Sequence, residues 1–290
     1  MKKIDAIELG ATLFIPATHK DLISVVEGRK YQNLKSVLVD CEDGINDSNL
    51  EKALENVKNL LINFQHGVTL VFLRAKNIDV LKIVLTYSGI DKIDGFILPK
   101  FSLLNAKEYL DTIGSKHLFM PSIEGDELFS PAKLFELKEI LFPYFKQIIT
   151  IRFGLEDMLK QLKMKRECKD SVFDIAVTAF VMGSFIATFK SAGFNISGGV
   201  FPCFKDNDGF IKDVKRDLKE GLFSKTIIHP NQIDLSNELY KVTKQEFDEA
   251  LEICESLEQI FNQNGKMAEQ STMIPYAKEI IKRAEVYGIL

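Results

Sequence analysis

Short apolar runs alternate with longer amphipathic stretches along most of the chain, and these runs predict eight β-strands. The predicted strands cover residues 12–16, 36–40, 69–74, 95–99, 117–123, 147–153, 195–200 and 225–229. Most of the runs are apolar at consecutive positions rather than at alternate ones. That pattern is typical of parallel strands that are covered on both faces.

The stretches between the predicted strands have helical spacing, for example residues 49–64 and 130–145. Eight strands in regular alternation with helices predict an α/β fold of the (β/α)8 type, a TIM barrel. A Rossmann-like open sheet whose strands have been miscounted is the alternative architecture.

The pattern changes near residue 230, so we expect residues 1–230 to form the barrel and residues 231–290 to form a C-terminal helical extension. The extension contains no further run of the strand type. It has two helical stretches, 244–262 and 272–287, on either side of a polar segment that includes Gly265. We expect it to pack on the barrel, to pack on a neighbouring subunit, or to act as a lid.

The composition is that of a folded globular protein. Of the 290 residues, 46% are apolar, and 37 Lys and Arg against 41 Asp and Glu give a net charge of −4. This balance excludes an intrinsically disordered chain. It also argues against nucleic acid as a partner, because phosphates require clustered cations. The densest basic stretch, residues 163–169, includes Glu167 and is predicted to be a solvated loop.

Four cysteines are scattered without a CxxC pair, so we expect reduced thiols in a cytoplasmic protein. They are Cys41, Cys168, Cys203 and Cys254. The amino-terminal residues reach acidic side chains before any long apolar run, which predicts no signal peptide. The most apolar stretch, 172–189, is interrupted by Asp174 and by hydroxyl side chains. We expect a buried helix there, at a subunit contact in one interpretation, and no membrane as a partner.

Charged residues follow most of the predicted strands, at the end where TIM barrels place catalytic groups. Carboxylates are in the majority there and favour a hard cation, with Mg2+ as the default. The four histidines lack the spacing of zinc ligands, and no GxGxxG, GxxxxGK[ST] or GxSxG motif occurs. The charged residues at these strand ends include Asp40, Glu42, Asp43, Arg74, Lys100, Glu124, Asp126, Glu127, Arg152, Glu156, Asp157, Lys205, Asp206 and, as a titratable neighbour, His229.

Eight motifs in order resemble the citrate lyase β-subunit-like branch of the HpcH/HpaI aldolase superfamily. They are TLFIPA at 12–17, VLVDCEDGI at 37–45, FLRAKN at 72–77, DGFILPK at 94–100, SIEGDELFS at 122–130, RFGLEDML at 152–159, GGVFPCFKDNDGF at 198–210 and KTIIHPNQI at 225–233. Each motif alone is weak, but their order along the predicted strands is specific. The resemblance covers most of the barrel and implies a divergent, stand-alone branch of that family.

The resemblance implies that Glu124 and Asp157 ligate Mg2+ and that Arg74 binds oxygen atoms of the substrate. It implies that Glu42 and Asp43 contact metal-bound water or orient neighbouring groups. Such enzymes make or break carbon–carbon bonds in short oxo or hydroxy acids, often as CoA thioesters. Mg2+ chelated by a 2-oxo acid acts as a Lewis acid that stabilises an enolate, and an arginine can hold the developing oxyanion. The expected activity is therefore that of a Mg2+-dependent lyase or aldolase.

Five further residues are expected to bind the substrate: Phe14, Pro16, Lys100, Phe201 and His229. Lys100 is interpreted as a carboxylate or phosphate contact, with a Schiff base as the competing role. His229 fits a general acid or base, with a structural hydrogen bond at the rim as the alternative. Each acidic residue that follows a strand has a further alternative role, because such residues commonly cap the next helix.

The chain departs from the family where relatives bind CoA. Gly10 and Ala11 stand where an Arg-Ser pair is common, and Ala17 replaces the glycine of the first motif. The CoA-binding surface is thus altered, and the substrate is a CoA thioester or a free acid. The family assembles as trimers or hexamers, which implies a homo-oligomer. Two alternatives stay open: a non-catalytic or carrier-dependent subunit of a lyase complex, and a barrel enzyme for a phosphorylated substrate.

Overall fold

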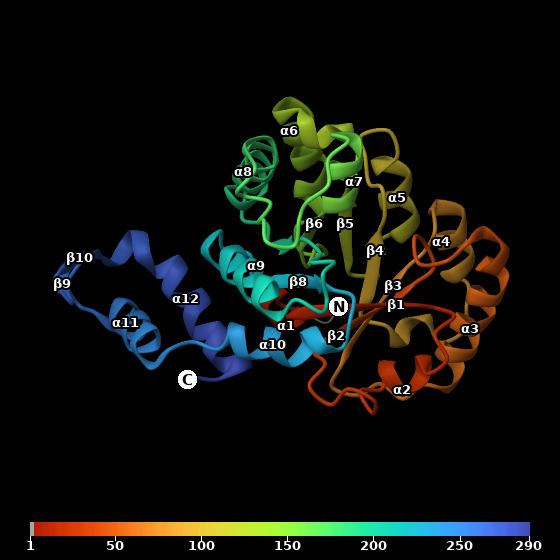
Figure 1. Ribbon diagram of the computed structural model, residues 1–290, viewed down its shortest axis with the longest axis horizontal. Coiled ribbons are helices and arrows are strands. Elements are labelled where there is room, and N and C mark those ends of the chain that lie inside the picture. Colours follow the sequence, from red (N-terminus) through yellow and green to blue (C-terminus); the bar gives the residue numbers. More distant parts are fainter. Residues whose placement is uncertain (1–2) are drawn as a thin grey trace. The chain divides into compact units, whose positions relative to one another are not determined.

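The computed structural model describes residues 3–290, which divide after Ile233 into two units. The first unit contains the strands of a barrel, and the second, Asp234–Leu290, contains helices and a small hairpin. Figure 1 shows the strands of the first unit at its centre, with helices around them.

The first unit is a closed barrel of parallel strands in the order β1-β2-β3-β4-β5-β6-β7-β8, with β8 pairing back to β1. The strands are β1 (Ala11–Pro16), β2 (Ser36–Asp40), β3 (Leu70–Arg74), β4 (Gly95–Leu98), β5 (Phe119–Ile123), β6 (Ile151–Phe153), β7 (Ile196–Gly198) and β8 (Ser224–Ile227). The predicted (β/α)8 barrel is therefore confirmed, and the open sheet is excluded.

Helices precede β1, connect successive strands and follow β8. They are α1 (Ala6–Leu9), α2 (Leu22–Val26), α3 (Leu50–Asn63), α4 (Ile78–Val84), α5 (Ala106–Ile113), α6 (Pro131–Leu141), α7 (Leu155–Gln161), α8 (Ala176–Lys190), α9 (Asn207–Lys219) and α10 (Asn231–Tyr240), which crosses the division between the units. Short 3-10 turns lie at η1 (Asp47–Asn49), η2 (Ile90–Lys92), η3 (Asp126–Phe129) and η4 (Phe142–Tyr144).

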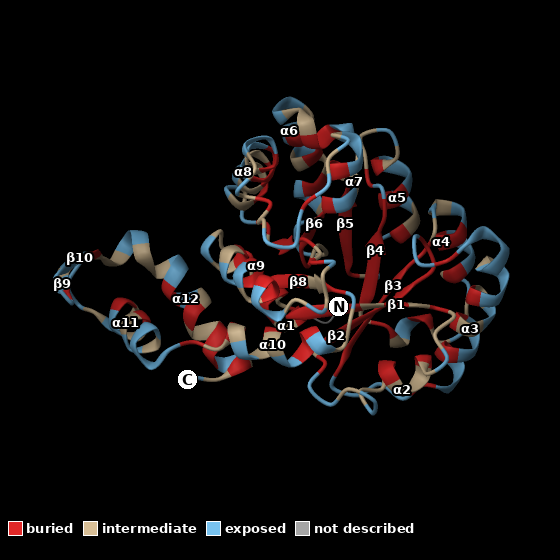
Figure 2. Ribbon diagram, in the orientation of Figure 1, coloured by how far each residue is buried: buried red, intermediate tan, exposed pale blue. Residues whose placement is uncertain are grey.

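The apolar runs become buried strands because both of their faces are covered. Every residue of β2, β3 and β5 is buried, and Figure 2 shows the barrel strands coloured as buried, with exposed residues on the outer helices. Inside the barrel, Leu38, Phe72, Ile97 and Met120 form one cluster, against which Phe14 packs. Burial of each such side chain contributes about 1.5–3 kcal/mol.

The short helix α1 closes the amino-terminal end of the barrel. Its residues Ala6 and Leu9 belong to the same cluster as Leu70 at the start of β3. Asp5 and Glu8 form a capping box, in which each side chain accepts a hydrogen bond from the other residue's backbone N–H. The sequence signal for this helix is an acidic cap followed three residues later by Glu.

The ends of the predicted strands differ from the observed ones, most clearly at the sixth. The run 147–153 supplies only β6, Ile151–Phe153, because its first residues turn back on η4. The backbone N–H of Gln147 donates to the carbonyl of Tyr144 at 2.8 Å, and its side chain donates to the carbonyl of Gly114 at 2.8 Å. The apolar pattern of the sequence does not by itself indicate such a turn.

The apolar stretch 172–189 supplies α8, but the expectation that this helix is buried on most sides is wrong, because it is buried on one side only. Its buried residues are Thr178, Val181, Met182, Phe185 and Phe189. Val177 and Phe180 are 39% and 64% exposed. Within residues 3–290, no helix has both the length and the apolar character needed to cross a bilayer.

The second unit contains α11 (Lys244–Glu255), α12 (Gln270–Tyr287) and a hairpin of β9 (Ile260–Gln263) and β10 (Lys266–Glu269). The expectation of no further strand in the extension is therefore wrong. Asn264 and Gly265 both have positive φ, 53° and 79°, and form the turn. Asn-Gly between two short runs is the strongest short-range hairpin signal, which the helical interpretation of 244–262 missed.

Candidate active site

A tight turn after β2 brings acidic side chains together at the carboxyl end of the barrel. Asp40, the last residue of β2, accepts hydrogen bonds from the backbone N–H groups of Glu42 and Gly44, each at 3.0 Å. A Cβ on Gly44 would lie 2.9 Å from Asp40 Oδ2, so only glycine permits this close approach. The turn thereby fixes the direction of the Glu42 and Asp43 side chains.

Arg74, at the end of β3, is neutralised by these carboxylates. Its Nε and Nη2 donate to Asp40 Oδ1 and Oδ2 at 2.7 and 2.9 Å, a bidentate pair. Its Nη1 lies 2.9 Å from Glu42 Oε2 and 3.5 Å from Asp43 Oδ2. Burial lowers the pKa of Arg74, but the carboxylates raise it further, so the guanidinium stays charged. Its donors are thus directed mainly at the protein itself.

Lys100 completes this charged group from the end of β4. Its ammonium pairs with Glu42 and lies 3.5 Å from Asp43 Oδ1. Burial raises the pKa of Glu42 to about 7 against the opposing charges of Arg74 and Lys100. Burial alone would lower the pKa of Lys100, but Glu42 raises it above its usual value. A lysine that forms a Schiff base needs a depressed pKa, so this geometry does not favour the competing role.

Glu124 lies on the loop after β5, and Asp157 lies in the first turn of α7, which follows β6. Glu124 is 5% exposed, and its Oε2 has no hydrogen-bond partner. A Cβ on Gly154 would lie 2.4 Å from Glu124 Cγ, so the glycine before α7 is what allows the two loops to meet. Burial raises the pKa of Glu124, and the negative charge of Asp157 raises it further.

This pair fits a small divalent cation. A buried carboxylate oxygen without a donor is costly unless an ion or water binds it. Within residues 3–290, no group of three or more His, Cys, Asp and Glu side chains forms a preassembled metal cage. Mg2+ needs no such cage, because it is commonly held by one or two carboxylates together with water and substrate oxygens.

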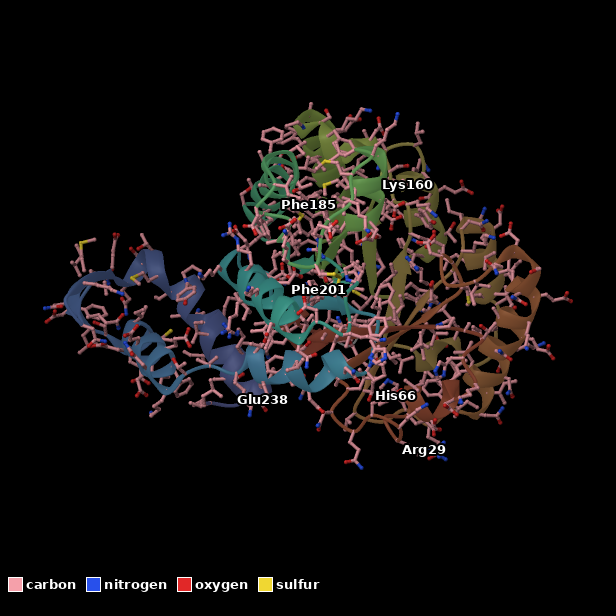
Figure 3. The ribbon with its side chains drawn as sticks, viewed as in Figure 1. Arg29, His66, Lys160, Phe185, Phe201 and Glu238 are labelled. Atoms are coloured by element: carbon pink, nitrogen blue, oxygen red, sulfur yellow. A yellow bond between two sulfur atoms is a disulfide. The ribbon has the colours of Figure 1, made fainter. Side chains whose placement is uncertain are left out.

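The predicted substrate-binding residues lie at different places on the rim. Phe14 packs under the Arg74 guanidinium, whose carbon lies 5.4 Å from the ring centroid, and Pro16 pairs with Asp40 in the sheet. Phe201, labelled in Figure 3, is 1% exposed and packs against Phe210.

His229 stacks on Phe204 with ring centroids 4.4 Å apart. Its Nδ1 accepts a hydrogen bond from the backbone N–H of Asn231 at 3.2 Å. The structure therefore brings Glu42, Asp43, Arg74 and Lys100 together in one group. Phe201 packs instead against Phe210 of α9, and His229 packs against Phe204 in the loop after β7.

A second buried cluster fixes the loop after β7. Lys225, which is fully buried, donates to Asp213 and Asp217 at 2.6 Å each and to the carbonyl of Gly199 at 2.8 Å. Arg166 pairs with Asp213 at 2.8 Å and donates to the carbonyl of Val200 at 2.9 Å. The basic stretch 163–169 is therefore not wholly solvated, because its arginine is buried.

The expectation of four reduced thiols is also wrong. Cys168 and Cys203 form a disulfide that joins the loop before α8 to the loop after β7, with their Cα atoms 5.9 Å apart. Cys41 and Cys254 are free. A separation of 35 residues leaves no sequence signal for this pairing, because only the closed barrel brings the two loops together.

A hollow of about 570 Å³ opens beside the charged group. Its lining residues are Glu42, Asp43, Ile45, Asn46, Asp47, Ser48, Lys76 and Lys100. Three of these residues are acidic and two are lysines, so the hollow suits a small polar molecule that carries negative charge near the lysines.

Comparison with known proteins gives consistent results. Residues 3–289 match the C-C bond lyase family of the TIM-barrel fold (C-C_Bond_Lyase). The citrate lyase subunit beta of Escherichia coli (strain K12) is 28% identical over 151 residues, which are 50% of this chain and 48% of that protein. The chain thus spans about half the length of that relative. The mitochondrial citramalyl-CoA lyase of Mus musculus is 23% identical over 283 residues, 89% of this chain and 78% of that protein.

A solved structure of a similar protein is that of CitE from Mycobacterium tuberculosis in complex with magnesium, acetoacetate and coenzyme A. Its TM-score to this chain is 0.70 at 17% identity, and the match covers 95% of this chain and 98% of that one. At this identity the likeness shows the fold alone.

Proposed function

Because the chain belongs to the C-C bond lyase family of the TIM-barrel fold, we propose that it is a Mg2+-dependent carbon–carbon lyase or aldolase for a short oxo or hydroxy acid. This membership agrees with the family that the eight motifs indicate. The observation that supports the activity most directly is Glu124, a buried carboxylate with a free oxygen beside Asp157.

In this proposal, Glu124 and Asp157 hold the cation. When bound, Mg2+ would supply positive charge that stabilises the negative charge developing on the oxo acid. Glu42 has a pKa near the ambient pH and can take up or release the proton of the reacting hydroxyl group. Asp40 and Arg74 keep Glu42 in place, and Lys100 offers its ammonium to an anionic group of the substrate.

Two classes of substrate fit this proposal, a free acid and a CoA thioester. The similar mouse protein is named for a CoA ester, and the mycobacterial structure contains coenzyme A. In this chain the stretch that resembles the CoA-binding surface has Gly10, Ala11 and Ala17 in place of the family residues. We therefore propose a free acid as the first substrate class to test and a CoA thioester as the second.

The test measures ligand-dependent thermal unfolding. With Mg2+ present, pyruvate, oxaloacetate or glyoxylate at 100 times its Kd should stabilise the wild-type protein by about 2.7 kcal/mol. For a chain of this size that corresponds to a rise in Tm of several degrees, since about 2–4 °C accompanies each kcal/mol. The Glu124→Gln variant should lose the shift, because the amide removes the negative charge that holds the cation.

Glu156→Gln is the matched control, since this exposed side chain is next to Asp157 in sequence. It should retain the shift. If neither Mg2+ nor any oxo acid changes the Tm of the wild-type protein, the site assignment is wrong. Repeating the measurement with malyl-CoA and acetyl-CoA then separates a thioester substrate from a free acid.

A carrier-dependent lyase subunit is the second candidate. One observation favours it: the Escherichia coli relative is named as a subunit, and the chain spans about half of its length. Such a subunit would bind Mg2+ and an oxo acid in isolation but would cleave no free or CoA-linked acid. Product analysis by NMR, performed on the same samples, distinguishes the two candidates.

A further inference from the structure

Arg152 is a buried arginine in the middle of β6, a strand of otherwise apolar residues. The residue is 4% exposed. Its guanidinium carbon lies 5.1 Å from the centroid of the Phe14 ring, and its Nη2 donates to the hydroxyl group of Thr226 on β8. Its Nη1 lies 4.0 Å from Met120 Sδ. These partners come from three other strands, so the side chain points into the barrel interior.

The charges around Arg152 differ from those around Arg74. Both guanidinium groups lie against the Phe14 ring, but Arg74 is paired with Asp40 and Glu42. Among the residues that the structure describes, no carboxylate lies within ion-pair distance of Arg152. A guanidinium has five N–H donors. The groups that face the donors of Arg152 are one hydroxyl group and one thioether.

An unpaired buried cation is unfavourable, and the pKa of Arg152 reflects this. Burial lowers it to about 9, the charge of Arg74 lowers it as well, and Glu124 opposes the shift. Breaking or omitting one partner of a buried ion pair costs several kcal/mol. A buried arginine without a counterion therefore indicates a function, and the group that would balance its charge is an anion.

The position of Arg152 adjoins the candidate metal site. Ser122 on β5 pairs with Arg152 in the sheet, and Glu124 follows two residues later. Alternate residues of a strand share a face, so Glu124 lies one layer closer to the open end of the barrel than Ser122 does. On the same side of the barrel the hydroxyl group of Ser224 is buried and has no hydrogen-bond partner. This part of the interior is therefore polar, and the hydroxyl group of Ser224 and donors of Arg152 are available to hydrogen-bond a ligand there.

We propose that Arg152 binds a carboxylate of the substrate, which reaches the barrel interior beneath the cation held by Glu124 and Asp157. Arg74 is then a positioning residue that holds the acidic turn after β2. This inference rests on the proposed function, because it takes the substrate to be a short oxo or hydroxy acid. It assigns recognition of the acid to Arg152, an arginine for which the resemblance to the family implied no role.

The test compares the wild-type protein with Arg152→Met by isothermal titration calorimetry, using oxaloacetate and pyruvate in the presence of Mg2+. Loss of a charge-assisted bidentate contact should weaken the Kd of both acids about tenfold to a hundredfold. The Kd of Mg2+ alone should change less than twofold. Arg29→Met, at an arginine whose side chain is 67% exposed, is the control and should bind both acids as the wild-type protein does.

The Tm without ligand separates recognition from a structural role. Replacing an unpaired buried charge by an apolar side chain of similar length should leave the Tm unchanged or raise it. Arg152→Lys is the second variant: it keeps the charge but not the planar fork, and it should bind the acids more weakly than the wild-type protein. An unchanged Kd in both variants would overturn the inference and leave the proposed function standing.

A probe without Mg2+ distinguishes failure of this inference from failure of the proposed function. Malonate is added to metal-free protein, and the Tm is measured for the wild type and for Arg152→Met. If the wild-type protein binds no oxo acid but malonate raises its Tm and not that of the variant, the proposed function fails and the anion site at Arg152 stands. If malonate affects both proteins equally, or neither, after oxo acids have failed to bind, the Arg152 site is overturned as well.

Discussion

Lys225 shows how a single buried residue can decide the stability of a loop. Its ammonium lies between Asp213 and Asp217 and also holds the carbonyl of Gly199, at the end of β7. Burial raises the pKa of Asp217 to about 6, while Lys225 opposes that shift. Removing the lysine would leave two buried carboxylates, of which Asp213 still pairs with Arg166.

We expect Lys225→Met to lower the free energy of unfolding by about 3–5 kcal/mol at pH 8, the usual cost of breaking a buried ion pair. The loss should shrink at pH 5. Without the lysine the pKa of Asp217 rises further, so the folded state takes up a proton as the pH falls, which relieves the buried charge. Urea unfolding at both pH values measures this.

Lys219→Met, on the exposed side of the same helix α9, is the control and should change stability by less than about 0.5 kcal/mol. Adding Asp213→Asn and Asp217→Asn to Lys225→Met should recover part of the loss at pH 8. An equal loss at pH 5 and pH 8 would contradict the role of the carboxylates.

At the level of elements, the disulfide and a hydrogen bond from Arg166 connect the same two loops. Cys168 lies before α8 and Cys203 lies after β7, near the rim that holds the candidate site. Arg166 reaches the carbonyl of Val200 from the same loop as Cys168. The loops are thus joined both covalently and by a hydrogen bond.

Reduction of this disulfide should destabilise the barrel. For a closed loop of about 35 residues, the chain-entropy model gives a loss of about 3–4 kcal/mol. Cys168→Ser with Cys203→Ser should therefore lower the Tm, and dithiothreitol should have little further effect on that double variant. Cys254→Ser is the control, because Cys254 is free.

Thiol alkylation followed by mass spectrometry checks the pairing directly. Unfolded wild-type protein should take up label at Cys41 and Cys254 without reductant and at all four cysteines after reduction. Labelling of all four without reductant in protein purified under air would show that the thiols are unpaired.

At the scale of the whole molecule, the second unit presents apolar side chains to solvent. Its core contains Ala250, Ile253 and Ala277. In the hairpin, Ala268 is buried, whereas Ile260 and Met267 lie on the opposite face and are 61% and 70% exposed. Successive side chains of a strand point to opposite faces of the hairpin. The face with Ile260 and Met267 is therefore apolar, and the second unit does not cover it.

We propose that this face contacts a second copy of the chain, as the homo-oligomer implied by the family would require. Light scattering should give the wild-type protein a mass well above the 32.9 kDa of one chain. Ile260→Lys with Met267→Lys should reduce the mass toward 32.9 kDa without loss of helical circular dichroism. Lys266→Glu, at an exposed residue on the opposite face of the hairpin, is the control, and a monomeric wild-type protein would contradict the proposal.

The candidate site was only partly predictable, for a physical reason that its residues illustrate. Glu42, Arg74 and Lys100 each follow a recognisable strand, and parallel strands in a barrel bring their carboxyl ends to one rim. The partners of these side chains depend on rotamers and on tight turns such as the one at Gly44. The hydrophobic periodicity of the sequence indicates neither. Arg152 interrupts an apolar strand, and this was a visible signal, but its lack of a counterion was not.

The amino-acid sequence alone specifies the order and type of the barrel elements, because periodicity and burial act over a few neighbouring residues. It also determined the charged residues at the strand ends and, through the eight motifs, the family. The three-dimensional structure was needed to show that Asp40 neutralises Arg74, that Cys168 meets Cys203 and that, within residues 3–290, Arg152 has no carboxylate beside it. These facts depend on distances between segments about 35 residues apart or more, which are fixed only when the strands close into a barrel.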